Sequence, residues 1–309
     1  MSTHANSHLV APVSARPPVK AYALLGFGIL CIGMSAIWVK WADLPGLVSA
    51  FYRVFIAALV LTSWWLVSRR RLPKRRALAL TGLGGVFFAL DLVLWNTALL
   101  ITTAAQATLL ANNAPLWVGL GALLIFHEKL PRLYWIGLAL ALAGMTLVAR
   151  PAGAQGFVLD SGSLMALAAS LFYAIYLLST QRVRSTTDTL TFMTVSVVSS
   201  SLLLLLICLL TGAQLTGFAT TTWLALLGLG LLSQVAGWLS INFVLGVLPA
   251  TQVSVSLLGQ VVVTAVLAAI IFGETPTVVQ TIGAVAVLAG IYLVLKARRP
   301  RPSLNSERG

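Results

Sequence analysis

Charged residues are scarce in this sequence, and acidic residues are the scarcest of them. Only 9% of the 309 residues are charged, with 7 Asp and Glu against 20 Lys and Arg. Soluble domains carry roughly 25% charged residues, so the composition excludes a soluble globular protein. The few acidic residues form no cluster that would serve as the acidic ring of a cation channel.

Histidine, cysteine and nucleotide-binding motifs are also sparse. His4, His8 and His127 lie outside the apolar stretches, which excludes a Ser–His pair or a His-ligated metal inside them. Cys31 and Cys208 fall at different depths of two such stretches, so no disulfide is expected. Without a Walker motif, ATP does not drive the protein directly. We therefore expect neither a cofactor nor a metal.

The sequence is instead rich in long apolar runs. Hydrophobic residues make up 59% of it, and the mean hydropathy is +0.97. Runs of about 20 residues, enough to cross the hydrocarbon of a lipid bilayer, recur between Pro- and Gly-containing turns. They predict an all-α, polytopic membrane protein with ten transmembrane helices. The expected spans 1 to 10 are 21–40, 46–67, 77–100, 103–126, 132–150, 162–181, 189–211, 222–246, 250–272 and 278–296.

The basic residues predict the orientation in the membrane. With the N-terminus inside, all of the 20 Lys and Arg except Lys40, Arg53 and Arg150 lie in cytoplasmic segments, as the positive-inside rule requires. Both termini are then cytoplasmic, with residues 1–20 as a disordered tail and 297–309 as a basic tail. A cleaved signal peptide is disfavoured because the first apolar run is too long. The charges are scattered over short loops, so no nucleic-acid partner is expected.

One segment of the sequence occurs twice. Residues 96–148 match residues 242–294 at an offset of 146 positions, with Asn, Gln, Glu and two glycines in register. The offset corresponds to five spans, an odd number, so the second copy enters the membrane inverted. We predict two five-helix repeats, 21–150 and 162–296. Inverted repeats are typical of secondary transporters, which hold their substrate near the midplane between the two halves.

Several short motifs accompany this duplication. They are Ala50–Ala58 in span 2, Ala104–Leu110 at the start of span 4, the turns Phe126–Pro131 and Phe272–Pro276, and the glycine-spaced helices 136–144 and 282–290. In these features the sequence resembles the EamA type of the drug/metabolite transporter superfamily. The resemblance implies an exporter of amino acids, other metabolites or drugs in the bacterial inner membrane. Within the superfamily the sequence is most similar to amino-acid exporters, including those for aromatic amino acids.

Charged side chains inside the spans are costly and therefore mark candidate functional positions. Arg53 lies in span 2 and Asp91 in span 3, at similar depths. They form a structural ion pair, or Arg53 extends outward toward Asp43, or Asp91 takes up a proton during transport, or either residue contacts the substrate. A membrane-embedded enzyme would need a second acid beside Asp91, and none is present, so we do not expect an enzyme.

Amide side chains near the midplane are the next candidates. Asn112 and Asn113 lie about half-way along span 4, one turn before Pro115, which permits a kink. The second copy has Leu258 and Gly259 at the same positions, so the repeat does not require these amides. We expect them to line a substrate pocket.

Span 8 combines amide and aromatic side chains. Gln234, Trp238 and Asn242 are four residues apart and share one helix face. Further pocket candidates on spans 3, 6 and 9 are Trp95, Tyr173, Tyr176 and Gln260. Such a wall suits a small-molecule substrate with an apolar body and polar ends. The alternatives are an interfacial belt for the aromatic residues and a hairpin-capping role for Asn242 and its counterpart Asn96, as for Gln106 and Gln252.

Spans 5 and 10 carry glycines seven residues apart, at Gly137 and Gly144 and again at Gly283 and Gly290. This spacing predicts close helix packing, with a homodimer contact as the alternative; we expect a monomer. Together these features predict an amino-acid exporter that works by alternating access. A drug or cation exporter is the main rival, although one intramembrane carboxylate is sparse provision for cations. A receptor is the remaining alternative.

Overall fold

The structure is a computed structural model that describes residues 19–102, 104–149, 160–273 and 276–297. Every regular element within these residues is a helix, and ten segments are long and apolar enough to cross a membrane. The predicted all-α fold with ten spans is therefore confirmed. The predicted tails lie outside the described residues except for positions 19, 20 and 297.

The first five spans contain seven helices, because spans 1 and 4 are each broken in two. The helices are α1 (Val19–Gly33), α2 (Ser35–Ala42), α3 (Gly46–Val67), α4 (Arg75–Ile101), α5 (Ala104–Ala111), α6 (Ala114–Leu124) and α7 (Arg132–Ala149).

The second five spans also contain interrupted helices, and span 8 includes a π-helical segment, η1, whose hydrogen bonds reach five residues back. The elements are α8 (Ser161–Arg184), α9 (Thr189–Leu210), α10 (Thr220–Gly228), η1 (Leu229–Gly237), α11 (Trp238–Leu245), α12 (Ala250–Leu257), α13 (Gly259–Phe272) and α14 (Val278–Lys296).

Side-chain caps fix where several helices begin. The Asp160 carboxylate accepts a hydrogen bond from the Ser163 backbone N–H at 2.7 Å and starts α8. Asp188 accepts from Thr191 at 3.2 Å and starts α9. A carboxylate at this position satisfies a free N–H group and interacts favourably with the helix dipole. The polar ends thus define where the apolar spans begin.

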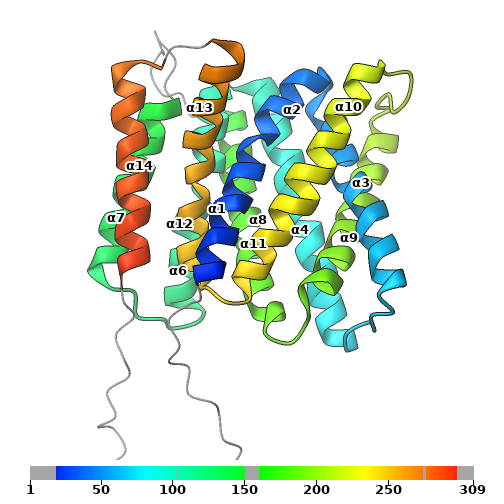
Figure 1. The fold of residues 1–309 in the computed structure, drawn as a ribbon, viewed down its shortest axis with the longest axis horizontal. Helices are drawn as coiled ribbons and strands as arrows, with labels where there is room; N and C mark the ends of the chain where they lie inside the picture. Colours follow the sequence, from blue (N-terminus) through cyan, green and yellow to red (C-terminus); the bar gives the residue numbers. More distant parts are fainter. Residues whose placement is uncertain (1–18, 103, 150–159, 274–275, 298–309) are drawn as a thin grey trace, which may run out of the picture.

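The helices stand side by side, and both described ends of the chain emerge at the same end of the bundle (Figure 1). Because successive spans alternate in direction, the loops α3–α4 and α6–α7 and the end of α8 lie at that end too. We call it the basic end, and the opposite one the far end. Its described basic residues are Lys20, Arg69, Arg70, Arg71, Lys74, Arg75, Arg76, Lys129, Arg132, Arg182, Arg184 and Lys296.

The main contacts between the two halves come in matched sets. Span 3 packs on span 6 through α4 and α8, and span 8 packs on span 1 through α11, η1 and α1. The contact of span 2 with span 8, through α3 and η1, is likewise matched by that of span 7 with span 3, through α9 and α4. Three further contacts each join a span to its own counterpart: α3–α9, α6–α12 and α7–α14. This exchange pattern is consistent with the predicted inverted repeats.

Helices α7 and α14 pack closely through the repeated glycines. A Cβ atom on Gly290 would lie 2.5 Å from the Gly137 carbonyl oxygen, and one on Gly283 would lie 2.6 Å from the Gly144 carbonyl oxygen. Only glycine permits such an approach of two helix backbones. The close packing predicted for these glycines occurs inside one chain, so they offer no exposed contact to a second copy.

Spans 4 and 9 break at equivalent positions. The helix of span 4 is interrupted at Asn112 and Asn113, and that of span 9 at Leu258, 146 positions after Asn112. The break in span 4 agrees with the kink expected from Pro115. Span 9 has no proline there and carries Gly259 instead, so the break belongs to the fold of both halves and does not depend on proline.

Candidate functional site

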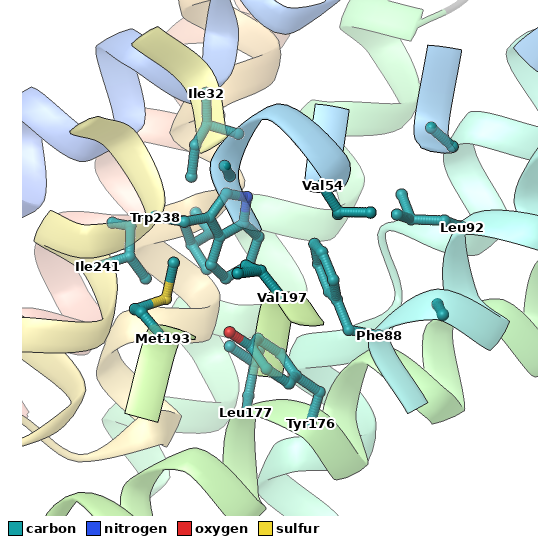
Figure 2. Close-up of a cluster of buried hydrophobic side chains, with 14 of the residues drawn as sticks. Ile32, Val54, Phe88, Leu92, Tyr176, Leu177, Met193, Val197, Trp238 and Ile241 are labelled. Carbon is teal, nitrogen blue, oxygen red and sulfur yellow. The ribbon is translucent and has the colours of Figure 1, made fainter. Parts of the chain in front are cut away.

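A buried cluster of side chains includes aromatic rings from α4, α8 and α11 (Figure 2). Trp238 of α11 is 3% exposed, and its ring centroid lies 5.1 Å from Phe88 of α4 and 5.6 Å from Tyr176 of α8. Met193 and Val197 of α9 pack against these rings (Figure 2). We call Phe88, Tyr176 and Trp238 the aromatic layer. It joins spans 3, 6 and 8, and each of its three rings lies against the other two.

Asn242 connects the aromatic layer to the basic end. Its amide nitrogen donates to the Tyr176 hydroxyl at 3.1 Å and to the Trp238 carbonyl at 2.8 Å. The backbone carbonyl of Asn242 accepts a hydrogen bond of 3.1 Å from Nε of Arg184, at the end of α8. Asn242 is fully buried. Toward the basic end, therefore, spans 6 and 8 are joined by packed and hydrogen-bonded groups.

One polar atom of the aromatic layer, the indole nitrogen of Trp238, is not hydrogen-bonded to any described residue, although it is enclosed. Buried donors are nearly always paired, so an orphan in a native structure requires an explanation. An acceptor from a ligand, reaching the ring when the layer separates, would supply one.

Arg53 and Gln234 meet across spans 2 and 8. Nε of Arg53 donates to Oε1 of Gln234 at 2.6 Å, and Gln234 is 1% exposed, so the guanidinium is held by a fixed amide. The two terminal nitrogens of Arg53 bond to no described residue, and they are not among the enclosed unpaired atoms. These nitrogens therefore face accessible space deep inside the bundle.

The carboxyl group of Asp91, on α4, is accessible in the same way as the Arg53 nitrogens. Its carboxylate makes no hydrogen bond or ion pair with any described residue, and its oxygens are not enclosed. It interacts electrostatically with Arg53 and Tyr173, but no Arg53 nitrogen lies within 4.0 Å of its oxygens. The direct ion pair considered for Arg53 and Asp91 is thus not formed in this structure, and Arg53 turns to Gln234, not to Asp43.

Tyr173 and Trp95 add further groups without a partner. Tyr173 of α8 is half-buried, and its ring centroid lies 5.9 Å from that of Trp238. Neither its hydroxyl nor the indole nitrogen of Trp95 bonds to a described residue, and neither atom is enclosed. We call Arg53, Asp91, Trp95 and Tyr173 the open group. Its members are a guanidinium, a carboxyl group, two further hydrogen-bond donors and two aromatic rings.

The open group lies on the far-end side of the aromatic layer. Span 6 enters from the far end, so Tyr173 lies one turn nearer that end than Tyr176. Span 3 ends there, so Asp91 and Trp95 both lie nearer to it than Phe88. The open group therefore lies on the far-end side of the aromatic layer, and the buried Tyr176–Asn242 bond lies toward the basic end.

The amides at the breaks of spans 4 and 9 form a separate pair. Nε2 of Gln260, in the first turn of α13, donates to Oδ1 of Asn112 at 3.3 Å. The Asn112 and Asn113 amide nitrogens donate back to carbonyls of their own helix, those of Thr108 and Leu109, each at 2.9 Å. All three amides are half-buried. No hydrogen bond connects them to the open group in the described residues.

Three of the polar residues that recur in both copies, Asn96, Gln106 and Asn242, make hydrogen bonds within the protein. Asn96 donates to the Leu92 carbonyl at 2.7 Å, one helical turn back, as Asn242 does to Trp238. Gln106 donates to the Ser163 hydroxyl at the start of α8. These contacts agree with the structural alternative for Asn96 and Gln106. Asn242 alone among them also reaches a ring of the aromatic layer.

A cavity of about 1020 Å³ opens at the basic end, apart from these residues. It is lined by the loop α3–α4, the start of α4, the end of α8 and the segment after α6, including Arg76, Glu128 and Arg182. None of the candidate substrate residues lines this cavity. We therefore base the site on the open group and the aromatic layer.

The pKa of Asp188, at the basic end, reflects its surroundings there. Burial acts to raise the pKa of this carboxyl, but hydrogen bonds from Thr191 and the charges of Arg70 and Arg184 outweigh it and lower the pKa. The pKa of Asp160, at the far end, is lowered by hydrogen bonds from the Ser163 side chain and backbone. Because their pKa values are lowered, both carboxylates stay ionised at neutral pH, and each caps the start of a helix, α8 for Asp160 and α9 for Asp188.

Sequence reasoning missed Phe88, a member of the aromatic layer, and Arg184, which donates to the backbone carbonyl of Asn242 beside it. Phe88 looks like one of many apolar residues, although it occupies the position equivalent to Gln234 of the second copy. Arg184 contributes to the orientation signal, and nothing in its neighbourhood indicates a bond to span 8. The described residues hold no group of His, Cys, Asp and Glu suited to a metal.

Comparisons with known proteins indicate a family and a fold. A model of the EamA-like transporter family matches residues 19–150 and 160–296. The "Uncharacterized transporter YdfC" of Bacillus subtilis (strain 168) is 24% identical over 252 residues, which cover 81% of this chain and 82% of that protein. A crystal structure of another protein superposes with a TM-score of 0.79 at 20% identity, covering 92% of this chain and 99% of that one.

Proposed function

The chain belongs to the EamA-like transporter family, and we propose that it is a secondary transporter that exports amino acids, aromatic or other neutral ones, by alternating access. The observation that carries the substrate class is the open group beside the aromatic layer. It offers charged, hydrogen-bonding and aromatic contacts in one interior space. These are the contacts that a small molecule with polar ends and an apolar body requires.

The position of the aromatic layer suggests how export proceeds. A substrate bound to the open group meets Tyr176 and Trp238 on its side toward the basic end. For it to exchange with the basic end, these rings and the Tyr176–Asn242 bond have to separate. We infer that Gln234, Trp238, Asn242 and Tyr176 contact the substrate in that second state, while Asn112, Asn113 and Gln260 adjust at the breaks of spans 4 and 9.

We further infer the setting in which the protein acts. The basic end faces the cytoplasm, because basic loops are retained on that side of the membrane. Both termini are then cytoplasmic, the membrane is the bacterial inner membrane, and the chain acts as a monomer. The matched contacts between its two halves support a monomeric unit, because one chain already contains both halves of the exchange.

Flux into proteoliposomes tests the proposal. The purified protein is presented with a panel of amino acids, with and without a pH gradient. We expect saturable uptake of aromatic or small neutral amino acids, reduced about tenfold in Asn112→Ala and in Trp238→Ala through lost hydrogen bonds and ring contacts. Trp64→Ala is the matched control, because Trp64 is 49% exposed on the outer surface of α3 and should leave uptake unchanged.

Three results would change the assignment. Uptake of organic cations or drugs without any amino acid would support the rival exporter class. Saturable binding without flux would indicate a receptor. Uptake that needs no pH gradient and persists in Asp91→Asn would exclude proton coupling through Asp91 and identify a facilitator.

A further inference from the structure

Arg53 and Asp91 carry opposite charges into the same interior space without neutralising each other by contact. Arg53 is anchored through Nε to the buried amide of Gln234, which leaves its terminal nitrogens exposed to that space. Asp91 has no partner in the described residues, and its oxygens are accessible. Charges deep in a membrane protein are costly unless they are paired. Two opposite groups, separated and unpaired with each other, therefore suit a ligand that pairs with both.

The chemistry of each group defines what it binds. The two terminal nitrogens of a guanidinium form a planar fork that matches the two oxygens of a carboxylate. A carboxylate such as Asp91 accepts hydrogen bonds from an ammonium group. A ligand that carries a carboxylate and an ammonium on adjacent atoms is an α-amino acid in its zwitterionic form. Neither an amine nor an acid alone satisfies both residues.

The surroundings of the two charges suit the rest of such a ligand. Tyr173 lies close to both Arg53 and Asp91, and its ring stands edge-on to Trp238, with an interplanar angle of 77°. Aromatic faces near a carboxylate stabilise an ammonium group and also pack against an apolar side chain. The unpaired indole nitrogen of Trp238 is one further donor next to this space.

We propose that Arg53 binds the carboxylate and Asp91 the ammonium group of a zwitterionic amino acid, with Tyr173 and Trp95 beside them. This inference rests on the proposed amino-acid export and specifies how the substrate is recognised. A zwitterionic amino acid has no net charge, so its binding leaves the net charge of the site unchanged. Each substrate therefore crosses the membrane without net charge transfer. While it binds the ammonium group, Asp91 is not available as a proton carrier.

Competition in proteoliposomes tests the recognition of both charges. Uptake of labelled phenylalanine is measured against unlabelled phenylalanine, phenethylamine, which lacks the carboxylate, and 3-phenylpropionate, which lacks the ammonium group. Alanine with ethylamine and propionate forms a second set. In the native protein each analogue should compete at least about tenfold more weakly than the amino acid, because a charge-assisted contact is lost.

Two variants assign each charge to its residue. In Arg53→Gln the advantage of the amino acid over the amine should disappear, while its advantage over the acid remains. In Asp91→Asn the opposite change is expected. Thr97→Val is the matched control: Thr97 lies on α4, and its hydroxyl bonds only to its own helix, at the Val93 carbonyl. Both ratios should stay unchanged in this variant.

The outcomes separate this inference from the proposed function. Amino-acid uptake with equal competition by amine and acid would overturn the inference and leave the function standing. Unchanged ratios in Arg53→Gln and Asp91→Asn would also overturn it. If a variant shows no uptake, competition in the native protein decides. The absence of all amino-acid uptake would overturn both proposals.

Discussion

Spans 3 and 8 occupy equivalent places in the two halves, yet they have diverged in a consistent way. Asn96 and Asn242 make the same bond to the carbonyl four residues back. Span 3, however, is the single helix α4, whereas span 8 contains the π-helical segment η1. Span 3 presents Asp91 where span 8 has Gly237, and span 8 presents Gln234 where span 3 has Phe88. Repeated residues hold the backbone, and unrepeated ones face the interior.

The same division holds elsewhere in the molecule. The glycine contacts of α7 and α14 and the breaks of spans 4 and 9 occur in both halves. The Asn112 amide has Leu258 as its counterpart in the second copy. Two halves that exchange conformations need a common framework, whereas one substrate has only one set of chemical groups to be recognised. The comparison therefore separates framework from recognition.

The largest effect is expected where the framework is closest. In Gly290→Val the new side chain would begin 2.5 Å from the Gly137 carbonyl oxygen, so α7 and α14 would have to move apart. We expect a loss of about 3 kcal/mol or more in stability, seen as a lower thermal midpoint and aggregation in detergent. Gly26→Ala is the control, because a Cβ atom there meets nothing within 4 Å. Equal stability of the two variants would contradict the assigned role of these glycines.

The second prediction distinguishes recognition from framework at Arg53 and Asp91. If the two charges were a structural pair, the double variant Arg53→Met/Asp91→Asn would recover what each single variant loses. We expect uptake to fall about 10- to 100-fold in both single variants, because each removes a charge-assisted contact to substrate, and to stay low in the double variant. Uptake and thermal midpoint are measured together. Recovery of uptake in the double variant would show that the pair is structural.

The third prediction compares Asn242 with Asn96 directly. Asn242→Ala leaves the buried Tyr176 hydroxyl without its partner, so a loss of about 1–3 kcal/mol is expected. Asn96→Ala removes only a bond within its own helix and should cost about 0.5 kcal/mol. Unfolding in detergent, followed by intrinsic fluorescence, gives the difference. Equal losses would mean that the repeated bond dominates at both positions.

The framework could be predicted from the sequence because it depends on local patterns. Apolar run length determines the ten spans, and the repeated glycines predict the close contact of spans 5 and 10. The break in span 4 was expected from Pro115. The equivalent break at Leu258 was not, because Gly259 by itself is compatible with a continuous helix. The segment η1 was also missed, since a π-helical segment has no sequence signature of its own.

The candidate site could be predicted only as a set of residue types. Polar and aromatic residues inside spans are visible in the sequence, and Arg53, Asp91, Trp238 and Asn242 were named on that basis. The pairing of Arg53 with Gln234, 181 positions apart, was not visible, because it depends on how spans 2 and 8 pack. The division into open and enclosed groups is also tertiary, since it depends on the depth and direction of each side chain.

The smallest effect is expected at Asp188, an exposed residue at the basic end that caps the start of α9. Its pKa in the folded protein is lowered, so its stabilisation is present above the unfolded-state pKa, about 4, and is lost as the pH falls through the folded-state value. Asp188→Asn keeps a capping side chain and removes the charge. Because the side chain is exposed, the variant should lose only about 0.5 kcal/mol at pH 7. The difference in thermal midpoint between the two proteins should be constant from pH 8 to 6 and vanish near pH 3; a difference that does not change with pH would show that the charge of Asp188 plays no part.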